Sequence, residues 1–361
     1  MSGDAGVVEG PLHGYHHETY VVPLPGRPGE AEPVRWKCRE PRPGLLWFDR
    51  RCFASEEELL RALQGRIEGI PDLIQAGSAG LQRFIEGETL GTLYGSGGGI
   101  PSSLLGQIVS LFGQLARVRP DSLTAERTCT SVYRAAEGDS DGFLERLILF
   151  TEEEVYQRNM PDFKGLFCDL GLDEVSFEKL RECVSGLTRR PFHLLHADLH
   201  RENFVVDGMG RLWTIDWELA MFGDPLYDLA THLYLMRYPR DQEDLMVEQW
   251  CEAVESESVV PGSSDGWEKD LPKLLDFKRA QSVFTDVIRT ALSLEEEERT
   301  ADASLLARAG DRIRQVLSAA TVPLGIKVPA EESVTAALGR WCEERAESAG
   351  VMAGAAVPGG A

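Results

Sequence analysis

The sequence predicts an α+β protein, in which a short β-rich region precedes a longer and mainly helical one. Strand-like segments bounded by glycine and proline occur before residue 95, at PVRWKCREP, 72–75 and 81–85. From residue 102 onward, apolar residues recur at the spacing of amphipathic helices, in the ranges 102–117, 142–159, 163–170, 176–187, 241–254, 272–294 and 303–317. This order of elements is typical of a small sheet followed by a helical part.

Glycine and serine are concentrated between residues 91 and 101, a composition that is typical of a linker. We therefore expect two lobes, residues 1–95 and 96–347, and a chain of 361 residues is long enough to form a core in each. Residues 348–361 are small and glycine-rich, which predicts a disordered tail.

The composition is that of a soluble globular protein, since 43% of the residues are apolar and 27% are charged. No uninterrupted apolar run approaches the roughly 18 residues that suggest a membrane-spanning helix. The opening stretch, MSGDAGVVEG, contains neither the basic region nor the apolar core of a secretion signal. We expect a cytoplasmic protein without a membrane partner.

The formal net charge of −22 argues against a nucleic-acid partner, because binding to phosphates needs a basic surface. An acidic surface can attract a cationic substrate, although the same charge can serve solubility alone. The seven cysteines are scattered and include no CxxC pair. They are expected to be buried thiols rather than disulfides or zinc ligands.

Residues with the chemistry of a catalytic site are concentrated in the range 196–216, which reads HADLHRENFVVDGMGRLWTID. The apolar run 192–195 predicts a strand, so the loop that leaves this strand carries Asp198. Residues 203–207 and 212–216 then predict a β-hairpin, because the glycines between them supply the positive φ of a tight connection.

The predicted hairpin brings two oxygen-bearing side chains to its open end. If Asp207 pairs with Leu212, the same antiparallel register places Asn203 opposite Asp216. An amide oxygen and a carboxylate suit Mg²⁺, which takes one or two protein carboxylates together with substrate phosphates. Asp198 is then left to accept a hydroxyl proton. In the alternative interpretation, Asp198 and Asn203 only cap a turn.

This segment, followed by IDWE and GDPLYDLA, resembles the catalytic segment of the aminoglycoside phosphotransferase and choline kinase family. The resemblance implies a bilobal protein-kinase-like fold, with a small β-rich N-terminal lobe and a larger helical C-terminal lobe. It implies that Asp198 orients the attacking hydroxyl and that Asn203 and Asp216 hold the metal. It also gives His196 and Asp228 a structural duty in supporting the catalytic loop.

Two further acidic residues follow the hairpin. Asp224 precedes Pro225, which predicts a helix cap. The family often has an acidic residue at the position of Glu218, from which it could reach the metal or a substrate amine.

The N-terminal region offers one lysine for binding phosphates. Lys37 is the only lysine before Lys164, and the resemblance implies a lysine here that holds the α- and β-phosphates. Arg35 and Arg39 share the strand face of Lys37 and are alternatives for this role. A lone lysine on a strand can also be a plain surface charge.

The expected partner of Lys37 is a glutamate on the next helix. Ser55 and Glu58 predict a capping box at the start of this helix, and a stripe of leucines marks its buried face. Glu56 shares that face, and the resemblance places the ion-pairing glutamate there. The alternative is that the three glutamates 56–58 only stabilise the helix N-terminus.

The resemblance further implies that LQRFIEGETL is the hinge, where main-chain groups of Arg83 and Ile85 bind adenine. The chain start lacks the GxGxxG of protein kinases, and only Gly14 and the polar run 16–19 suggest a phosphate-covering turn. The histidines 13, 16 and 17 lack acidic or cysteine partners at ligand spacing, so they do not predict a metal site.

We therefore expect a phosphotransferase that uses ATP or GTP with Mg²⁺ to phosphorylate a hydroxyl of a small molecule. A cationic natural product, such as an aminoglycoside or a basic peptide antibiotic, fits both the resemblance and the acidic charge. One alternative is a kinase that phosphorylates Ser or Thr of a ribosomally synthesised peptide before a partner lyase eliminates the phosphate. Another is a pseudokinase scaffold, which is disfavoured because no catalytic position is lost.

Overall fold

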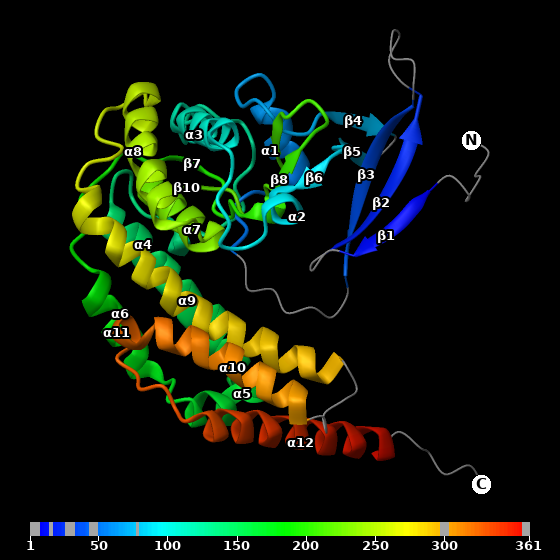
Figure 1. Ribbon diagram of the computed structural model, residues 1–361, viewed down its shortest axis with the longest axis vertical. Coiled ribbons are helices and arrows are strands. Elements are labelled where there is room, and N and C mark those ends of the chain that lie inside the picture. Colours follow the sequence, from blue (N-terminus) through cyan, green and yellow to red (C-terminus); the bar gives the residue numbers. More distant parts are fainter. Residues whose placement is uncertain are drawn as a thin grey trace. The chain divides into compact units, whose positions relative to one another are not determined.

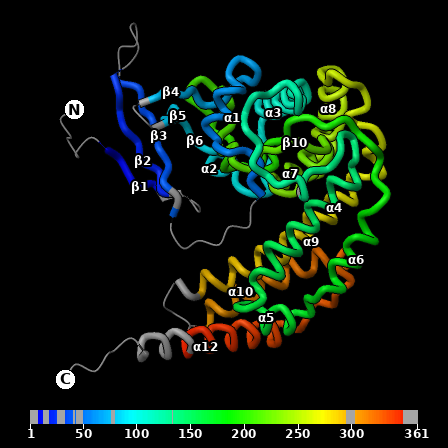
Figure 2. The backbone as a smooth tube through the Cα atoms, turned by 180° about the vertical axis from the view of Figure 1, so that it is seen from behind, coloured from blue at the N-terminus to red at the C-terminus, as the bar shows by residue number. Residues whose placement is uncertain are grey.

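The computed structural model describes residues 8–13, 17–25, 33–42, 50–76, 79–296 and 303–355. The chain divides into two compact units, Met1–Ser140 with Arg189–Trp267 (unit 1) and Asp141–Thr188 with Glu268–Ala361 (unit 2). Figure 1 labels the helices and strands, and Figure 2 shows the chain from behind. A small antiparallel sheet and a larger helical part are both present, so the predicted α+β class is confirmed.

Unit 1 begins with an antiparallel sheet in the strand order β1-β2-β3-β5-β4. Its strands are β1 (Glu9–His13), β2 (His17–Leu24), β3 (Val34–Pro41), β4 (Leu73–Ala76) and β5 (Ala79–Arg83). Lys37 lies on the central strand, between Val21 of β2 and Gln82 of β5. Its side chain is therefore enclosed, and the residue is only 8% exposed.

Helix α1 (Glu56–Leu63) begins at the predicted cap. The Ser55 hydroxyl accepts a hydrogen bond from the amide of Glu58 at 3.2 Å, which satisfies one free N–H of the first turn. The leucine stripe of this helix is fully buried, as its periodicity predicts. The burial of this stripe fixes the rotation of α1, and with it the direction of Glu56.

The catalytic segment lies on short strands in the same unit. A three-stranded antiparallel sheet contains β6 (Glu88–Thr89), β8 (Phe204–Val206) and β9 (Leu212–Thr214), and β7 (His193–Leu195) pairs with β10 (Met221–Gly223). Besides α1, the α-helices of this unit include α2 (Leu90–Tyr94), α3 (Ser102–Ala116), α7 (Pro225–Met236) and α8 (Arg240–Glu257). Helices α3 and α8 lie side by side (Figure 1).

The predicted linker at residues 91–101 is partly helical. Helix α2 continues to Tyr94, and the Thr89 hydroxyl caps it by accepting from the amide of Thr92 at 3.1 Å. A capping threonine thus starts a helix in a stretch whose glycine content suggests a loop. The predicted lobe boundary near residue 95 falls inside unit 1, and it stays a prediction.

Unit 2 is built from helices. These are α4 (Ser140–Phe150), the π-helical stretch η3 (Thr151–Gln157), α5 (Arg158–Asp169), α6 (Glu174–Val184), α9 (Trp267–Glu296), α10 (Ala303–Ala319), α11 (Thr321–Leu324) and α12 (Glu331–Ala355). Aromatic rings form part of its core, where Phe177 stacks on Phe284 at 4.6 Å and Tyr156 packs edge-on against Phe284. None of the described helices is long and apolar enough to cross a membrane.

Two features of unit 2 differ from the simple helical pattern in the sequence. The π-helical stretch η3 precedes Pro161, whose missing N–H interrupts the regular ladder of α5. Helix α12 extends to Ala355, so residues 348–355 of the predicted disordered tail are helical in the structure. The remainder of that tail, residues 356–361, lies outside the described residues.

A buried ion pair holds the start of α7. Arg190 Nε lies 2.9 Å from Asp224 Oδ1, and Arg190 Nη2 lies 2.9 Å from Asp224 Oδ2. Both side chains are at most 1% exposed. Asp224 also accepts from the amide of Leu226, so it is the cap that its position before Pro225 predicts.

Replacing Asp224 with alanine should lower the free energy of unfolding by about 3–5 kcal/mol, because the Arg190 charge would stay buried without its carboxylate. Urea denaturation followed by tryptophan fluorescence measures the change. Glu182→Ala is the control, since it removes one member of the exposed Lys179 pair and should leave the midpoint unchanged. A wild-type midpoint for the Asp224 variant would show that this pair does not stabilise the fold.

Candidate active site

The loop after β7 carries Asp198 at a strand end, as predicted. The Asp228 carboxylate on α7 accepts from the amides of His196 and Ala197, at 3.0 and 2.7 Å. Ala197 has a φ of 67°, in the left-handed region that residues with a Cβ disfavour. His196 Nε2 lies 3.1 Å from the carbonyl of Ile215, which connects the loop to the hairpin. These contacts hold a strained turn directly before Asp198, and the supporting role that the family resemblance implies for His196 and Asp228 stays a prediction.

Replacing Asp228 with alanine should lower kcat by up to about a hundredfold. The loop would lose its support, and a shift of a catalytic group by about 1 Å can reduce the rate by this factor. The KM for the nucleotide should change little. Steady-state kinetics test this, with Asp244→Ala as the control at an exposed position of α8. A wild-type kcat in a folded Asp228 variant would contradict the supporting role.

Asn203 links Asp198 to the hairpin. Its Nδ2 donates to the main-chain carbonyl of Asp198 at 2.9 Å and to Asp198 Oδ2 at 3.1 Å. Because the amide nitrogen is committed to these two acceptors, Asn203 Oδ1 is the atom left to face a cation. Asn203 is 4% exposed, so its orientation is well fixed.

The hairpin register differs from the predicted one by one residue. Val206 pairs with Leu212, and the amide of Ile215 donates to the carbonyl of Asn203 at 3.0 Å. Asn203 therefore lies opposite Ile215, and the prediction that it lies opposite Asp216 is wrong.

The cause of the shift is the turn. The amide of Asp207 donates to the carbonyl of Arg211 at 3.0 Å, which leaves a three-residue connection instead of the four-residue one expected. The Asp207 carboxylate accepts from the amides of Met209 and Arg211, and Gly210 has a φ of 77°. A turn followed by a left-handed glycine is a common three-residue hairpin connection.

Asp216 reaches the site through its own backbone conformation. It follows β9 by two residues and has a φ of 66°, which Asp and Asn tolerate better than other residues with a Cβ. Its Oδ1 lies 3.1 Å from Arg39 Nη1. Burial alone raises the pKa of Asp216, but the charges of Arg39 and Lys37 outweigh it and lower the pKa. The carboxylate therefore stays ionised.

Asn203 and Asp216 fit a magnesium site by their chemistry. They supply an amide oxygen and an ionised carboxylate, the hard oxygen ligands that this cation takes alongside phosphate oxygens. Within the described ranges, no group of three His, Cys, Asp or Glu residues is placed to hold a metal. A site of this kind would depend on the nucleotide for its remaining ligands.

The structure pairs Glu56 with Arg39 rather than with Lys37. Arg39 Nη1 lies 3.1 Å from Glu56 Oε2, and the same nitrogen contacts Asp216. Glu56 also accepts from Gln82 Nε2 at 2.7 Å and from the amide of Trp217 at 2.8 Å. Lys37 forms no ion pair with any described residue, so the expected Lys37 to Glu56 pair is not met. Arg39, an alternative from the shared strand face, connects α1 to the hairpin instead.

Lys37 has a desolvated ammonium group. Burial lowers the pKa of Lys37 to about 8, and the charge of Arg39 adds to this effect. Glu56 and Asp216 act in the opposite direction. A cation that has lost its hydration and has no close anion is ready to bind a phosphate.

Sequence reasoning missed His200. Its Nε2 lies 3.3 Å from Asp198 Oδ2, the same carboxylate oxygen that accepts from Asn203. Burial alone lowers the pKa of His200, but the hydrogen bond with Asp198 outweighs it and the pKa is raised. The available signal was a second histidine two positions after Asp198 in HADLH.

Glu218 adds a further acidic group next to Asp216. Burial raises the pKa of Glu218 to about 7, and the Asp216 charge adds to this effect. Arg51 Nη2, 2.7 Å from Glu218 Oε2, acts against it. Near neutral pH this group can therefore exchange a proton.

The predicted hinge is partly engaged within the sheet. The amide of Arg83 donates to the carbonyl of Asp72 at 2.8 Å, and the amide of Phe84 donates to the carbonyl of Arg35 at 2.9 Å. The Arg83 amide is therefore already used within the sheet, and the prediction that main-chain groups of Arg83 and Ile85 bind adenine remains only for their other main-chain groups. Of the predicted phosphate-covering turn, residues 14–16 lie outside the described residues, and 17–19 begin β2.

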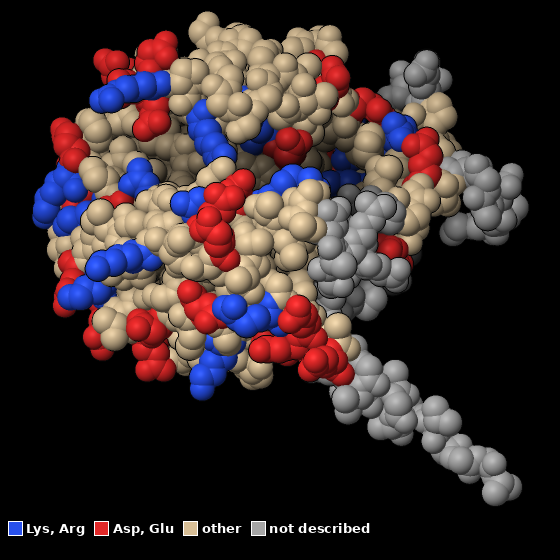
Figure 3. All heavy atoms as spheres, turned by 60° about the horizontal axis from the view of Figure 1, so that its bottom comes forward, with Lys and Arg blue, Asp and Glu red and all other residues tan. Residues whose placement is uncertain are grey.

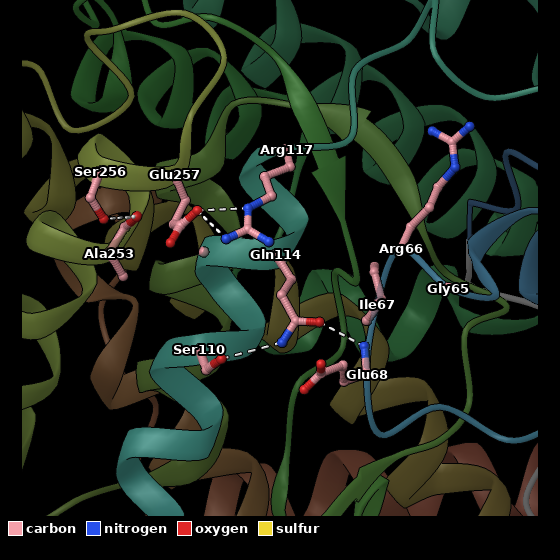
Figure 4. Close-up of a pocket in the computed structure, with 11 residues that line it drawn as sticks. Gly65, Arg66, Ile67, Glu68, Ser110, Gln114, Arg117, Ala253, Ser256 and Glu257 are labelled. Carbon is pink, nitrogen blue, oxygen red and sulfur yellow. Dashed lines mark hydrogen bonds and ion pairs between the residues drawn. The ribbon is translucent and has the colours of Figure 1, made fainter.

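A separate cavity of about 480 Å³ lies between the loop at residues 65–68, α3 and the end of α8 (Figure 4). Arg117 of α3 is ion-paired with Glu257 of α8, and Gln114 Oε1 accepts from the amide of Glu68 at 2.6 Å. Arg66 points away from both pairs (Figure 4). Neither Asp198 nor any other side chain of the candidate site lines this cavity.

The chain belongs to the phosphotransferase enzyme family, whose family model matches residues 9–269. The resemblance to a phosphotransferase family that the sequence predicts is confirmed. Two LicA proteins of Haemophilus influenzae are 32% identical over 85 residues. The match covers 23% of this chain and only 24% and 30% of the LicA chains.

Several solved structures are also similar. The choline/ethanolamine kinase family protein of Mesorhizobium loti has 15% identity and a TM-score of 0.47, with 94% of each chain covered. The macrolide 2′-phosphotransferase MphH of Brachybacterium faecium has 15% identity and a TM-score of 0.48, with 91% of this chain and 95% of that chain covered. A thermostable mutant of aminoglycoside phosphotransferase APH(4)-Ia has 14% identity and a TM-score of 0.48, with 89% of this chain and 96% of that chain covered.

Proposed function

We propose that the protein transfers the γ-phosphate of ATP or GTP to a hydroxyl of a small, cationic natural product, such as an aminoglycoside or a basic peptide antibiotic. The observation that carries this proposal is a pair of side-chain groups in unit 1, one around Asp198 and one around Asp216. Asp198 contacts Asn203, while Arg39 bridges Asp216 and Glu56. A proton acceptor, two metal ligands and cations for phosphate are the groups that phosphoryl transfer needs.

In this mechanism the acceptor hydroxyl oxygen attacks the γ-phosphorus, and the bond from that phosphorus to the bridging oxygen of the nucleotide breaks. The Asp198 carboxylate aligns the hydroxyl and takes its proton. Asn203 and Asp216 would hold Mg²⁺, which neutralises phosphate charge when bound. Lys37 would bind the phosphates from β3. Catalysis would come mainly from positioning and charge stabilisation.

The support for a cationic acceptor comes from acidic groups. The chain has a net charge of −22, yet acidic and basic side chains are interspersed on the face shown in Figure 3. The charge of the whole surface is therefore weaker support for a cationic acceptor than the carboxylates that lie next to the reacting groups. Glu218, beside Asp216, is the acidic residue that we assign to an acceptor amine, which would share this carboxylate with Arg51.

An acceptor panel tests the proposal. The protein is incubated with magnesium and ATP or GTP, and with aminoglycosides that include hygromycin B, a macrolide, choline, basic peptide antibiotics and Ser/Thr-rich peptides. A mass gain of about 80 Da, the transferred phosphoryl group, identifies the acceptor. Phosphorylation of the Ser/Thr-rich peptides alone would favour the peptide kinase. Absence of any nucleotide binding would favour a scaffold.

Nucleotide affinity should fall as the pH rises above about 8, because the Lys37 ammonium loses its proton there. Below this pH the group is charged and can pair with phosphate, so the expected decrease is at most about tenfold per pH unit. Fluorescence titrations between about pH 7 and about pH 9.5 measure it. Lys37→Arg keeps its charge and should remove the decrease. A wild-type affinity that is flat across this range would contradict the assignment of Lys37 to the phosphates.

A further inference from the structure

Two cysteines of unit 1 lie together away from the residues assigned to phosphate transfer. Cys52 precedes α1, and Cys129 lies in the segment before η2 (Ser131–Tyr133). We propose that Cys52 and Cys129 form a site that reacts with hydroperoxides, in which Cys129 attacks the oxidant and Cys52 then closes a disulfide. This proposal departs from the expectation that the cysteines are buried thiols rather than disulfides.

A short antiparallel bridge brings the two cysteines together. Phe53 pairs with Arg127 in this bridge. On one side of the pair, the amide of Ala54 donates to the carbonyl of Glu126 at 3.0 Å. On the other side, the amide of Thr128 donates to the carbonyl of Cys52, also at 3.0 Å. Both members of the bridge pack against a third element. The ring of Phe53 lies 5.9 Å from that of Phe222, and the guanidinium of Arg127 lies 5.2 Å from the same ring. The two segments are thus held in place before any reaction.

The backbone bridge places Cys52 opposite Thr128, the neighbour of Cys129, and the surroundings of the two cysteines are basic. Arg134 Nε donates to Cys129 Sγ at 3.4 Å, while Arg134 Nη2 donates to the carbonyl of Arg127 at 2.9 Å. The second bond fixes the guanidinium beside the sulfur. Arg50, 9% exposed, adds a further positive charge.

These contacts give the two sulfurs different roles. The nearby Cys52 thiol, together with Arg134, lowers the pKa of Cys129, although burial acts against it. The Cys129 sulfur and burial raise the pKa of Cys52. One sulfur is therefore a thiolate and the other keeps its proton. A thiolate is the nucleophile in cysteine oxidation, so Cys129 reacts first.

Exposure points to the same order. Cys129 is 7% exposed and stands between Thr128 and Thr130, which are both exposed, whereas Cys52 is 1% exposed. A small oxidant needs little movement to reach Cys129 and cannot reach Cys52 directly. This size limit favours hydrogen peroxide or a small alkyl hydroperoxide over a bulky disulfide.

The reaction balances with two thiols and one peroxide as its only reactants. The Cys129 thiolate attacks one peroxide oxygen, the O–O bond breaks, and the leaving oxygen takes a proton from solvent to give water or an alcohol. Cys129 is then a sulfenic acid. The Cys52 sulfur attacks the Cys129 sulfur, and the sulfenic oxygen leaves with the Cys52 proton as water. Two thiols are oxidised and one peroxide is reduced.

Tryptic mapping of the wild-type protein tests the proposal without any variant. Cleavage at arginine releases residues 52–61 and 128–134, and each peptide contains a single cysteine. After a low dose of hydrogen peroxide and blocking of free thiols, these two peptides should be recovered joined by a disulfide. The exposed Cys168 should stay free at the same dose. Earlier oxidation of Cys168, or no joined peptide, would overturn the proposal.

Variants test the assigned order of the two sulfurs. Cys52→Ser should stop at the sulfenic acid, which dimedone traps on Cys129. Cys129→Ser should leave Cys52 unoxidised. Arg134→Gln should slow alkylation of Cys129 about fivefold or more at about pH 5.5, where only a thiol of low pKa is ionised. Arg158→Gln, which loses an exposed ion pair elsewhere, is the control and should have no effect. Equal rates in the two arginine variants would refute the role of Arg134. None of these readouts depends on phosphotransfer.

Discussion

Replacing Asp198 with asparagine should lower kcat by about 10²- to 10⁴-fold, the usual contribution of a positioned proton acceptor. The substitution keeps the size of the side chain, and Asn203 can still donate to the new amide oxygen. The dissociation constant of the nucleotide should therefore stay close to the wild-type value. The loss should appear in kcat because the carboxylate acts on the acceptor hydroxyl and not on the nucleotide.

Rapid-quench kinetics with the best acceptor of the panel, together with a nucleotide titration, separate these two effects. Asp244→Asn makes the same chemical change at an exposed position of α8 and should leave both quantities unchanged. Retention of full turnover in Asp198→Asn would remove this residue from the mechanism. A parallel loss of nucleotide binding would point to a collapsed loop instead.

Replacing Asp216 with asparagine should lower kcat/KM by about a thousandfold, since metal-assisted charge neutralisation supplies several kcal/mol to the transition state. Asparagine is the informative substitution because of the backbone. Asp216 has a φ of 66°, and Asn is the other residue with a Cβ that adopts this conformation readily. Alanine would add a backbone penalty of about 1–2 kcal/mol and confuse lost catalysis with lost folding.

The same variant should show a weaker dependence on magnesium. The wild-type protein is expected to bind the nucleotide more tightly when magnesium is present, and Asp216→Asn should lose most of that difference. Calorimetric titrations with and without magnesium measure it, and a thermal melt confirms that the variant is folded. Unchanged magnesium dependence would mean that Asp216 serves only as the partner of Arg39.

Elements that follow from local patterns could be read from the sequence. The leucine stripe of α1 and its serine cap, the strand before Asp198 and the Asp224 cap before Pro225 are all present. Each depends on residues that are close in sequence. Helix α12 was missed because its small residues give a weak pattern, and α2 because a single threonine cap outweighs the glycines around it.

The details of the site depended on choices that sequence spacing does not fix. A three-residue turn and a four-residue turn both suit the glycines after Asp207, and the difference moved every hairpin partner by one position. The choice between Lys37 and Arg39 as partner of Glu56 also needed the structure. One guanidinium nitrogen of Arg39 contacts both Glu56 and Asp216, whereas Lys37, which shares its strand face, forms an ion pair with neither.

The catalytic segment lies between the two pieces of unit 2 in the chain, and this order affects how the protein is made. During synthesis, residues 141–188 leave the ribosome long before α9, yet Tyr156 and Phe177 find their ring partner Phe284 only on that later helix. Until then, Tyr156 can pack only against rings of its own segment, such as Phe167 and Phe177, and the side of this core that Phe284 covers stays exposed. The nascent chain is therefore exposed to misassociation during the very interval in which His196 to Asp228 is being added.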